Sequence, residues 1–121
     1  MPIMSSCDDV EAYVTKDGSI IRELMHPQVH GNSSQSLAEA RVAPGSSTLL
    51  HRHNVTEEIY HILGGMGLLT LGDGLIEVKA GDSVCISPGT LHSIKNTGEN
   101  ELRILCCCSP AYSHDDTELA E

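Results

Sequence analysis

The stretch that decides the fold is His51-Arg-His-Asn-Val-Thr-Glu-Glu-Ile-Tyr-His-Ile-Leu-Gly-Gly65, because it concentrates more potential metal ligands than any other part of the chain. His51 and His53 are two residues apart, so on a β-strand both side chains leave the same face. Such a pair alone is more often exposed to solvent. Two imidazoles followed closely by a carboxylate, however, are a natural start for a divalent-metal site.

The rest of the chain has the pattern of short strands. Turn residues such as Lys16-Asp-Gly18 separate apolar or alternating segments. These segments cover residues 11–15, 19–25, 36–42, 47–53, 57–63, 66–71, 75–79, 83–87, 91–95 and 102–108. No stretch of ten or more residues combines helical apolar spacing with helix caps. About ten short strands predict an all-β protein, an antiparallel sandwich or small barrel.

The 121 residues are expected to form a single domain. Within it, residues 1–35 are interpreted as N-terminal strands and a loop, residues 36–110 as the core, and residues 111–121 as an acidic C-terminal tail. Three Tyr with no Phe or Trp mean that the core must be aliphatic. Few aromatic platforms are therefore present for stacking on a sugar or nucleobase.

The charge balance argues against two classes of partner. Lys and Arg number 7 against 17 Asp and Glu, which gives a formal net charge of −10. Nucleic-acid binding needs clustered cations, and an anionic membrane surface repels an acidic protein. We expect neither nucleic-acid nor membrane partners, but a small-molecule substrate or ligand.

The cysteines indicate a reducing compartment. Five are present, Cys7, Cys85 and the run Cys106–Cys108, and their spacing fits neither a zinc ribbon nor a disulfide framework. Neither a secretory signal nor a long apolar stretch is expected. We therefore predict a cytoplasmic protein whose thiols act mostly as small apolar side chains. On a strand, Cys106 and Cys108 share one face and Cys107 the other.

Two segments that each begin with a glycine resemble the sequence motifs of a known family. Gly45 is followed by five residues, His51-x-His53, four residues, Glu58, six residues and Gly65. Later, Gly81 and Gly89 precede His92 by ten and two residues, and Asn96 follows after three. In this order the two segments resemble both sequence motifs of the cupin superfamily, over roughly residues 36–110. Ser87 stands where the second motif usually has Pro, and the neighbouring Pro88 is expected to set the turn.

The resemblance implies a small double-stranded β-helix, the cupin or jelly-roll barrel, with a metal inside. Its implied ligands are His51, His53, Glu58 and His92, around one divalent ion. Three nitrogens and one oxygen suit Fe, Mn, Ni, Zn or Cu and leave positions for water or substrate. The ligand set does not choose among these metals.

Two glutamates compete for the carboxylate position, because the family spacing allows either. On a strand Glu58 shares its face with Tyr60, and Glu57 shares the other with His61. The order Glu-Ile-Tyr-x-Ile-Leu-x-Gly resembles the family with Glu58 as the ligand. We therefore predict that Glu57 is the outward neighbour and that His61 is not a ligand.

Several functions suit such a site. An enzyme acting on a small oxygenated substrate could perform dioxygenase, isomerase, lyase or cyclase chemistry, and fold does not choose among these. Tyr60 and Glu57 are candidate catalytic groups, with His61 or a tail residue as further possibilities. The alternative is a non-catalytic metal-containing binding or sensor module. Strands that are apolar on both faces, and the resemblance itself, favour a homodimer.

Overall fold

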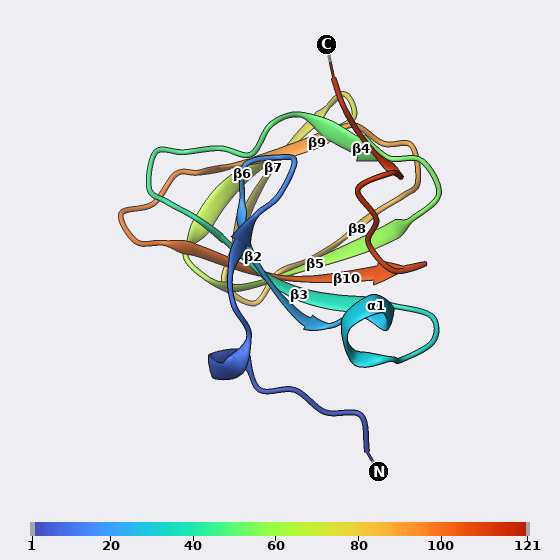
Figure 1. Cartoon of the computed structure of the whole chain (residues 1–121). Coiled ribbons are helices and arrows are strands. Elements are labelled where there is room, and N and C mark those ends of the chain that lie inside the picture. Colours follow the sequence, from blue (N-terminus) through green and yellow to red (C-terminus); the bar gives the residue numbers. More distant parts are fainter. Residues whose placement is uncertain (1, 121) are drawn as a thin grey trace.

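The computed structural model describes residues 2–120 and contains two antiparallel sheets that face each other (Figure 1). The six-stranded sheet has the order β1 (Tyr13–Val14), β2 (Ile20–Met25), β3 (Ser36–Val42), β10 (Leu102–Ser109), β5 (Glu57–Gly64) and β8 (Ser83–Ile86). The five-stranded sheet has the order β11 (Thr117–Leu119), β4 (His51–His53), β9 (His92–Asn96), β6 (Met66–Leu71) and β7 (Gly74–Lys79). The two short helices are η1 (Cys7–Asp9) and α1 (Pro27–His30). The all-β prediction is confirmed.

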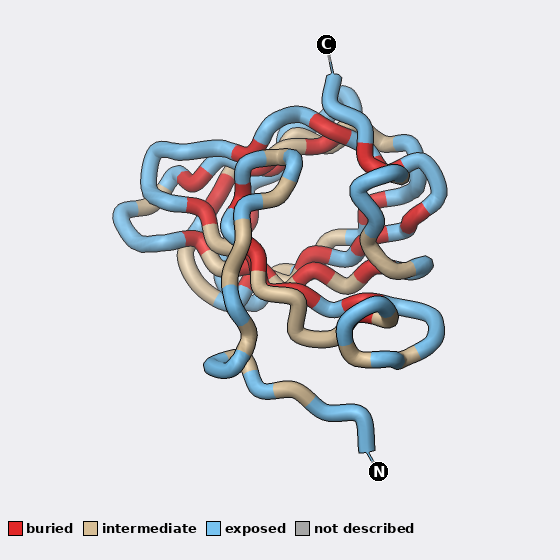
Figure 2. Tube along the Cα trace, in the orientation of Figure 1, coloured by how far each residue is buried: buried red, intermediate tan, exposed pale blue. Residues whose placement is uncertain are grey.

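The space between the sheets holds the core (Figure 2). Alternate residues point inward on the central strands, as the burial patterns of β5 and β10 show. The buried apolar side chains come from both sheets and are Ile21, Ala38, Ala40, Val42, Tyr60, Ile62, Leu69, Val78, Ile86, Ile94, Leu102, Ile104 and Cys106. Ala38 and Ala40 are small, so β3 leaves room in front of it. That room becomes the cavity described below.

The connection between β5 and β6 requires glycine. Gly65 has φ +87°, in the left-handed region that side chains with a Cβ avoid. A Cβ there would also lie 3.0 Å from the carbonyl oxygen of Glu101. The Gly that ends the first sequence motif is therefore a backbone position, and it brings the chain from one sheet to the other.

Both ends of the chain take part in the sheets. β1 and β2 pair as a hairpin and extend the six-stranded sheet beyond β3. The segment interpreted as an acidic tail contributes β11, which pairs with β4 so that Thr117 lies opposite His53. Lys16 in the hairpin turn donates hydrogen bonds to the carbonyl oxygens of His114 and Thr117. The hairpin and the C-terminal segment thus meet over one end of the barrel.

No helix among the described residues has the length and apolar character needed to cross a membrane.

The outer face of the six-stranded sheet carries one buried carboxylate among arginines. Glu39 on β3 is 4% exposed, although it points away from the core. Its Oε1 accepts a hydrogen bond from Arg41 at 2.7 Å and its Oε2 accepts one from Arg103 at 3.0 Å. Arg22 lies 3.9 Å from Oε1. Burial alone would raise the pKa of Glu39, but the hydrogen bonds and charges of Arg41 and Arg103 outweigh it and lower the pKa.

We expect this lowered pKa to make stability depend on acid pH. The contribution of Glu39 is fully present above the ordinary carboxyl pKa of 4.5 and is lost as the pH falls through the lower pKa of the folded state. Glu39→Gln should cost about 1.5–3 kcal/mol at pH 7, the usual contribution of hydrogen bonds to charged groups. The cost should shrink as the pH drops below 4.5. Urea unfolding of wild type and variant at several pH values measures both.

The matched control is Glu101→Gln, because Glu101 contacts only one of these arginines, Arg41, and is half exposed. It should change stability by much less. An equal loss in both variants, or a Glu39→Gln cost that is constant with pH, would contradict this account of the Glu39 cluster.

Candidate metal centre

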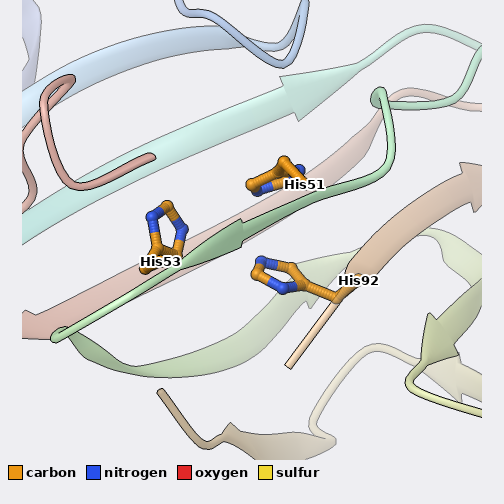
Figure 3. A group of neighbouring side chains, drawn as sticks. All are labelled: His51, His53 and His92. Atoms are coloured by element: carbon orange, nitrogen blue, oxygen red, sulfur yellow. The ribbon is translucent and has the colours of Figure 1, made fainter. Parts of the chain in front are cut away.

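Three histidines from neighbouring strands meet inside the barrel (Figure 3). His51 and His53 leave β4 on the same side, and His92 reaches them from β9. The antiparallel register of these strands places His51 directly opposite His92. All three are buried, and one nitrogen of each lies within 4.8 Å of the others. Residues separated by about forty positions in the sequence thus form one cluster.

Hydrogen bonds orient each ring by its Nδ1 atom. His51 Nδ1 lies 2.7 Å from the carbonyl oxygen of Leu49, and His92 Nδ1 lies 2.9 Å from that of Thr90. A carbonyl oxygen can only accept, so each Nδ1 donates. In a neutral imidazole, a protonated Nδ1 leaves the Nε2 lone pair free for a metal.

The third ring is held by a hydroxyl group. His53 Nδ1 lies 2.9 Å from Thr117 Oγ1, and that hydroxyl donates to the carbonyl oxygen of Ser113 at 2.8 Å. Its proton is therefore committed, and it accepts from His53 Nδ1. β11 supplies this contact, so the C-terminal strand orients a residue of the cluster.

Glu58 approaches the same point from the opposite sheet. Its Oε1 lies 3.2 Å from His53 Nε2 and 3.5 Å from His92 Nε2. Its Oε2 accepts a hydrogen bond from the Cys108 thiol at 3.3 Å. The buried oxygen Oε1 and the buried nitrogen His92 Nε2 have no hydrogen-bond partner. The carboxylate is thus held by one oxygen while the other points at the imidazoles.

The surroundings fix the charge of two of these groups. Burial, together with the nearby His92, lowers the pKa of His51, so this ring is neutral at neutral pH. Burial would raise the pKa of Glu58, but hydrogen bonds and positive charge from the imidazoles of His53 and His92, when these rings carry the proton, outweigh burial and lower that pKa to about 2. A neutral nitrogen ligand and an ionised oxygen ligand are the states that a divalent metal binds.

The donor set fits a divalent metal. Facing lone pairs on Nε2 and on a carboxylate oxygen repel each other unless a proton or a cation lies between them. The Oε1 of Glu58 and the Nε2 of His92 are buried without a hydrogen-bond partner, so a cation between them would satisfy both. Three imidazoles and one carboxylate are also ligands that divalent metals accept. His51, His53, His92 and Glu58 are therefore the residues that would hold the ion.

The other predicted residues divide between inside and outside. Tyr60 is buried and lines the cavity next to the histidines, and burial with the nearby Glu58 raises the pKa of its phenol. Glu57 is exposed and does not line the cavity, and His61 contacts Ser83 on the outer face. The predicted alternation along this strand is confirmed. Cys106 and Cys108 face inward as expected.

A further carboxylate, Asp17, lies in the cavity and was not predicted from the sequence. Asp17 lies in the β1–β2 turn, where its residue type is explained by turn formation alone. In the structure its Oδ2 lies 3.4 Å from His51 Nε2. Only the folding of the hairpin over the barrel, a non-local contact, brings it there. Thr117 was missed for the same reason.

The family is established by comparison with known proteins. A family model described as a cupin domain matches residues 38–108, and this chain belongs to that family. An uncharacterized protein of Methanocaldococcus jannaschii, MJ1618, is 55% identical over 119 residues, which are 98% of this chain and 95% of that protein. The resemblance seen in the two motifs is confirmed.

Two more similarities concern proteins with named activities. An oxalate-binding protein of Thermotoga maritima is 38% identical over 84 residues, 69% of this chain and 65% of the relative. The structure of the polyketide cyclase RemF from Streptomyces resistomycificus superimposes with a TM-score of 0.83, covering 100% of this chain and 87% of that one at 23% identity. The shared fold is the double-stranded β-helix barrel that the motifs imply.

We expect Thr117 to support metal binding without touching the metal. Thr117→Val keeps the side-chain shape and removes the acceptor for His53 Nδ1, so the ring loses its fixed orientation. The affinity for Zn²⁺, measured by competition with a chelating dye, should fall by about 10- to 100-fold. The exposed Thr97→Val is the matched control. An unchanged Zn²⁺ affinity in a folded Thr117→Val protein would contradict the role of this hydroxyl.

Proposed function

We propose that this protein is a metal-dependent enzyme that acts on a small oxygenated organic substrate. The observation that carries the proposal is the unpartnered Glu58 Oε1 facing the Nε2 atoms of His53 and His92. A divalent metal bound there supplies a Lewis acid for a substrate oxygen. The same arrangement is compatible with dioxygenase, isomerase, lyase or cyclase chemistry.

The cavity around the histidines also contains a hydrogen-bond donor and an apolar wall, and both could assist catalysis. Tyr60 presents a phenol whose raised pKa keeps the proton on it, so it can donate a hydrogen bond to a substrate oxygen. Ala38, Ala40 and Ile104 form an apolar wall that strengthens electrostatic interactions by excluding water. Of the two candidate catalytic groups, Tyr60 lines the cavity where a substrate could reach it, whereas Glu57 lies outside the cavity.

A binding or sensor module is the second candidate. It is favoured by the relative in Thermotoga maritima, which is named as oxalate-binding. A module of this kind would keep the metal and take up a ligand without converting it. Incubation of the metal-loaded protein with candidate substrates, followed by nuclear magnetic resonance of the solution, separates turnover from binding.

We expect metal content to depend on the proposed ligands. His51→Ala and Glu58→Gln should each lose the metal, measured by elemental analysis of the purified protein, while the circular dichroism signal of the β-sheet stays. Glu57→Gln is the matched control next to Glu58, and it should keep full metal. Near-zero metal in reconstituted wild type would exclude the site. A loss in Glu57→Gln but not in Glu58→Gln would reverse the carboxylate assignment.

We also propose that two copies pair through the outer face of the six-stranded sheet. The register aligns Leu37, Cys107, Ile59 and Cys85 in one row across β3, β10, β5 and β8. Leu37 and Ile59 are 36% and 42% exposed. The arginines around Glu39 lie on the same face. This face is therefore less negative than expected from the net charge of −10 of the whole chain. A second acidic copy would meet less repulsion here than the net charge of the whole chain implies.

Sedimentation tests the pairing. Wild type should sediment at about twice the 13.0 kDa of one chain, and Ile59→Glu should shift it to the monomer. Leu75→Glu, at an exposed position of β7 in the other sheet, should stay dimeric. Wild type that sediments as a monomer would contradict the proposal.

The five free cysteines support a reducing compartment, the cytoplasm, as the place of action, which cell fractionation would test.

A further inference from the structure

The cavity carries two more carboxylates than the proposed metal ligands need, and both come from the β1–β2 hairpin. They are Asp17 in the turn and Glu23 on β2. We propose that they accept hydrogen bonds from the hydroxyl groups of the substrate, and that the substrate class is a small neutral molecule with neighbouring oxygens, a hydroxycarbonyl compound or a vicinal diol. This inference rests on the proposed metal-dependent function and names the substrate of the same site.

Asp17 has one committed oxygen and one free one. Its Oδ1 accepts from the Thr15 hydroxyl at 2.6 Å, from the Ser19 amide at 2.9 Å and from the Ser19 hydroxyl at 2.7 Å. These contacts hold the side chain, so Oδ2 is fixed toward His51 Nε2 at 3.4 Å. His51 donates through Nδ1 to Leu49, and its Nε2 is a metal ligand in the proposed function. Asp17 Oδ2 is therefore an acceptor in the cavity that can take a hydrogen bond from a ligand.

Glu23, like Asp17, has one carboxylate oxygen that accepts a hydrogen bond and one that does not. Its Oε1 accepts a hydrogen bond from the Tyr13 hydroxyl at 2.7 Å. Its Oε2 is buried without a hydrogen-bond partner. Buried acceptors without donors are rare because their desolvation is costly. A ligand that brings a hydroxyl donor to Glu23 Oε2 would remove that cost, and a second hydroxyl could donate to Asp17 Oδ2.

The charges in the cavity disfavour an acidic substrate. Among the described residues that line it, none is a lysine or arginine, whereas Asp17, Glu23 and Glu58 are acidic. Three carboxylates outweigh the charge of one divalent metal. A dicarboxylate would add negative charge at short range in a place where water screens it poorly. Oxalate, the ligand named for the relative in Thermotoga maritima, is therefore a poor match for this cavity.

Size limits the substrate to a small molecule. The free volume inside is about 40 Å³, far below the roughly 150 Å³ of a cavity that holds benzene. Glu23 and Tyr112 line both this cavity and a wider surface depression next to it. A small molecule would thus enter past Glu23. The inner space suits a compact molecule of few atoms.

The test compares one neutral and one dianionic probe on the Mn²⁺-loaded full chain. Dihydroxyacetone and oxalate are titrated by calorimetry into wild type and into Asp17→Asn/Glu23→Gln. Each substitution keeps the oxygen that the protein already uses and replaces the free oxygen by an NH₂ donor. Glu77→Gln, exposed on β7, is the control. The Mn²⁺ content of every sample is measured before and after titration.

We expect wild type to bind dihydroxyacetone at least tenfold tighter than oxalate. The double variant should bind dihydroxyacetone about tenfold more weakly and oxalate more tightly, because an acceptor has become a donor. A merely structural role would weaken both ligands together, and that result overturns the inference. A Mn²⁺-loaded wild type that prefers oxalate overturns the substrate class and leaves the metal site standing. Wild type that holds no Mn²⁺ overturns the proposed function and this inference together.

Discussion

The site depends on one electrostatic constraint, the meeting of nitrogen lone pairs and a carboxylate oxygen in a dry interior. Glu58 Oε1 lies within 3.2 Å and 3.5 Å of two Nε2 atoms, and neither sheet gives it a hydrogen-bond partner. Such a group is costly to bury unless a cation or a proton joins it to its neighbours. The low pKa of Glu58, about 2, means that the carboxylate keeps its charge. In the proposed function, a divalent ion would satisfy all of these atoms at once.

The barrel orients these groups through hydrogen bonds to the atoms that do not face the proposed metal position. The ring of His51 is fixed by a backbone carbonyl, that of His53 by Thr117, and the carboxylate of Glu58 by Cys108. These contacts come from Leu49, just before β4, from Thr117 on β11 and from Cys108 on β10, so both sheets contribute. Orientation of this kind is what usually separates a tight metal site from a loose one.

The sequence was sufficient for the parts of the site that follow from local periodicity. The two-residue spacing of His51 and His53 predicted a shared face, and alternation along the next strand predicted that Glu58 and Tyr60 share one face and Glu57 the other. The resemblance to the cupin family then favoured the face of Glu58 as the inner one. Strand positions followed from turn residues, and the framed segment around His92 predicted its partnership with the first motif. Each of these inferences uses residues that are close in the chain or a motif that is matched in order.

The rest of the site depends on contacts between distant segments, which periodicity does not report. Asp17 and Glu23 enter the cavity only because the N-terminal hairpin folds over the barrel. Thr117 orients His53 only because residues interpreted as a tail form β11 beside β4. A turn aspartate and a threonine in an acidic segment have ordinary local explanations, so nothing in the sequence marks them.

The proposed metal site can be observed in a crystal structure of the purified protein, with anomalous diffraction data collected across metal absorption edges. We expect one anomalous peak inside the barrel, about 2.0–2.2 Å from the Nε2 atoms of His51, His53 and His92 and from Glu58 Oε1. A metal-reconstituted crystal without a peak at that point, or with Glu58 turned away from the ion, would contradict it.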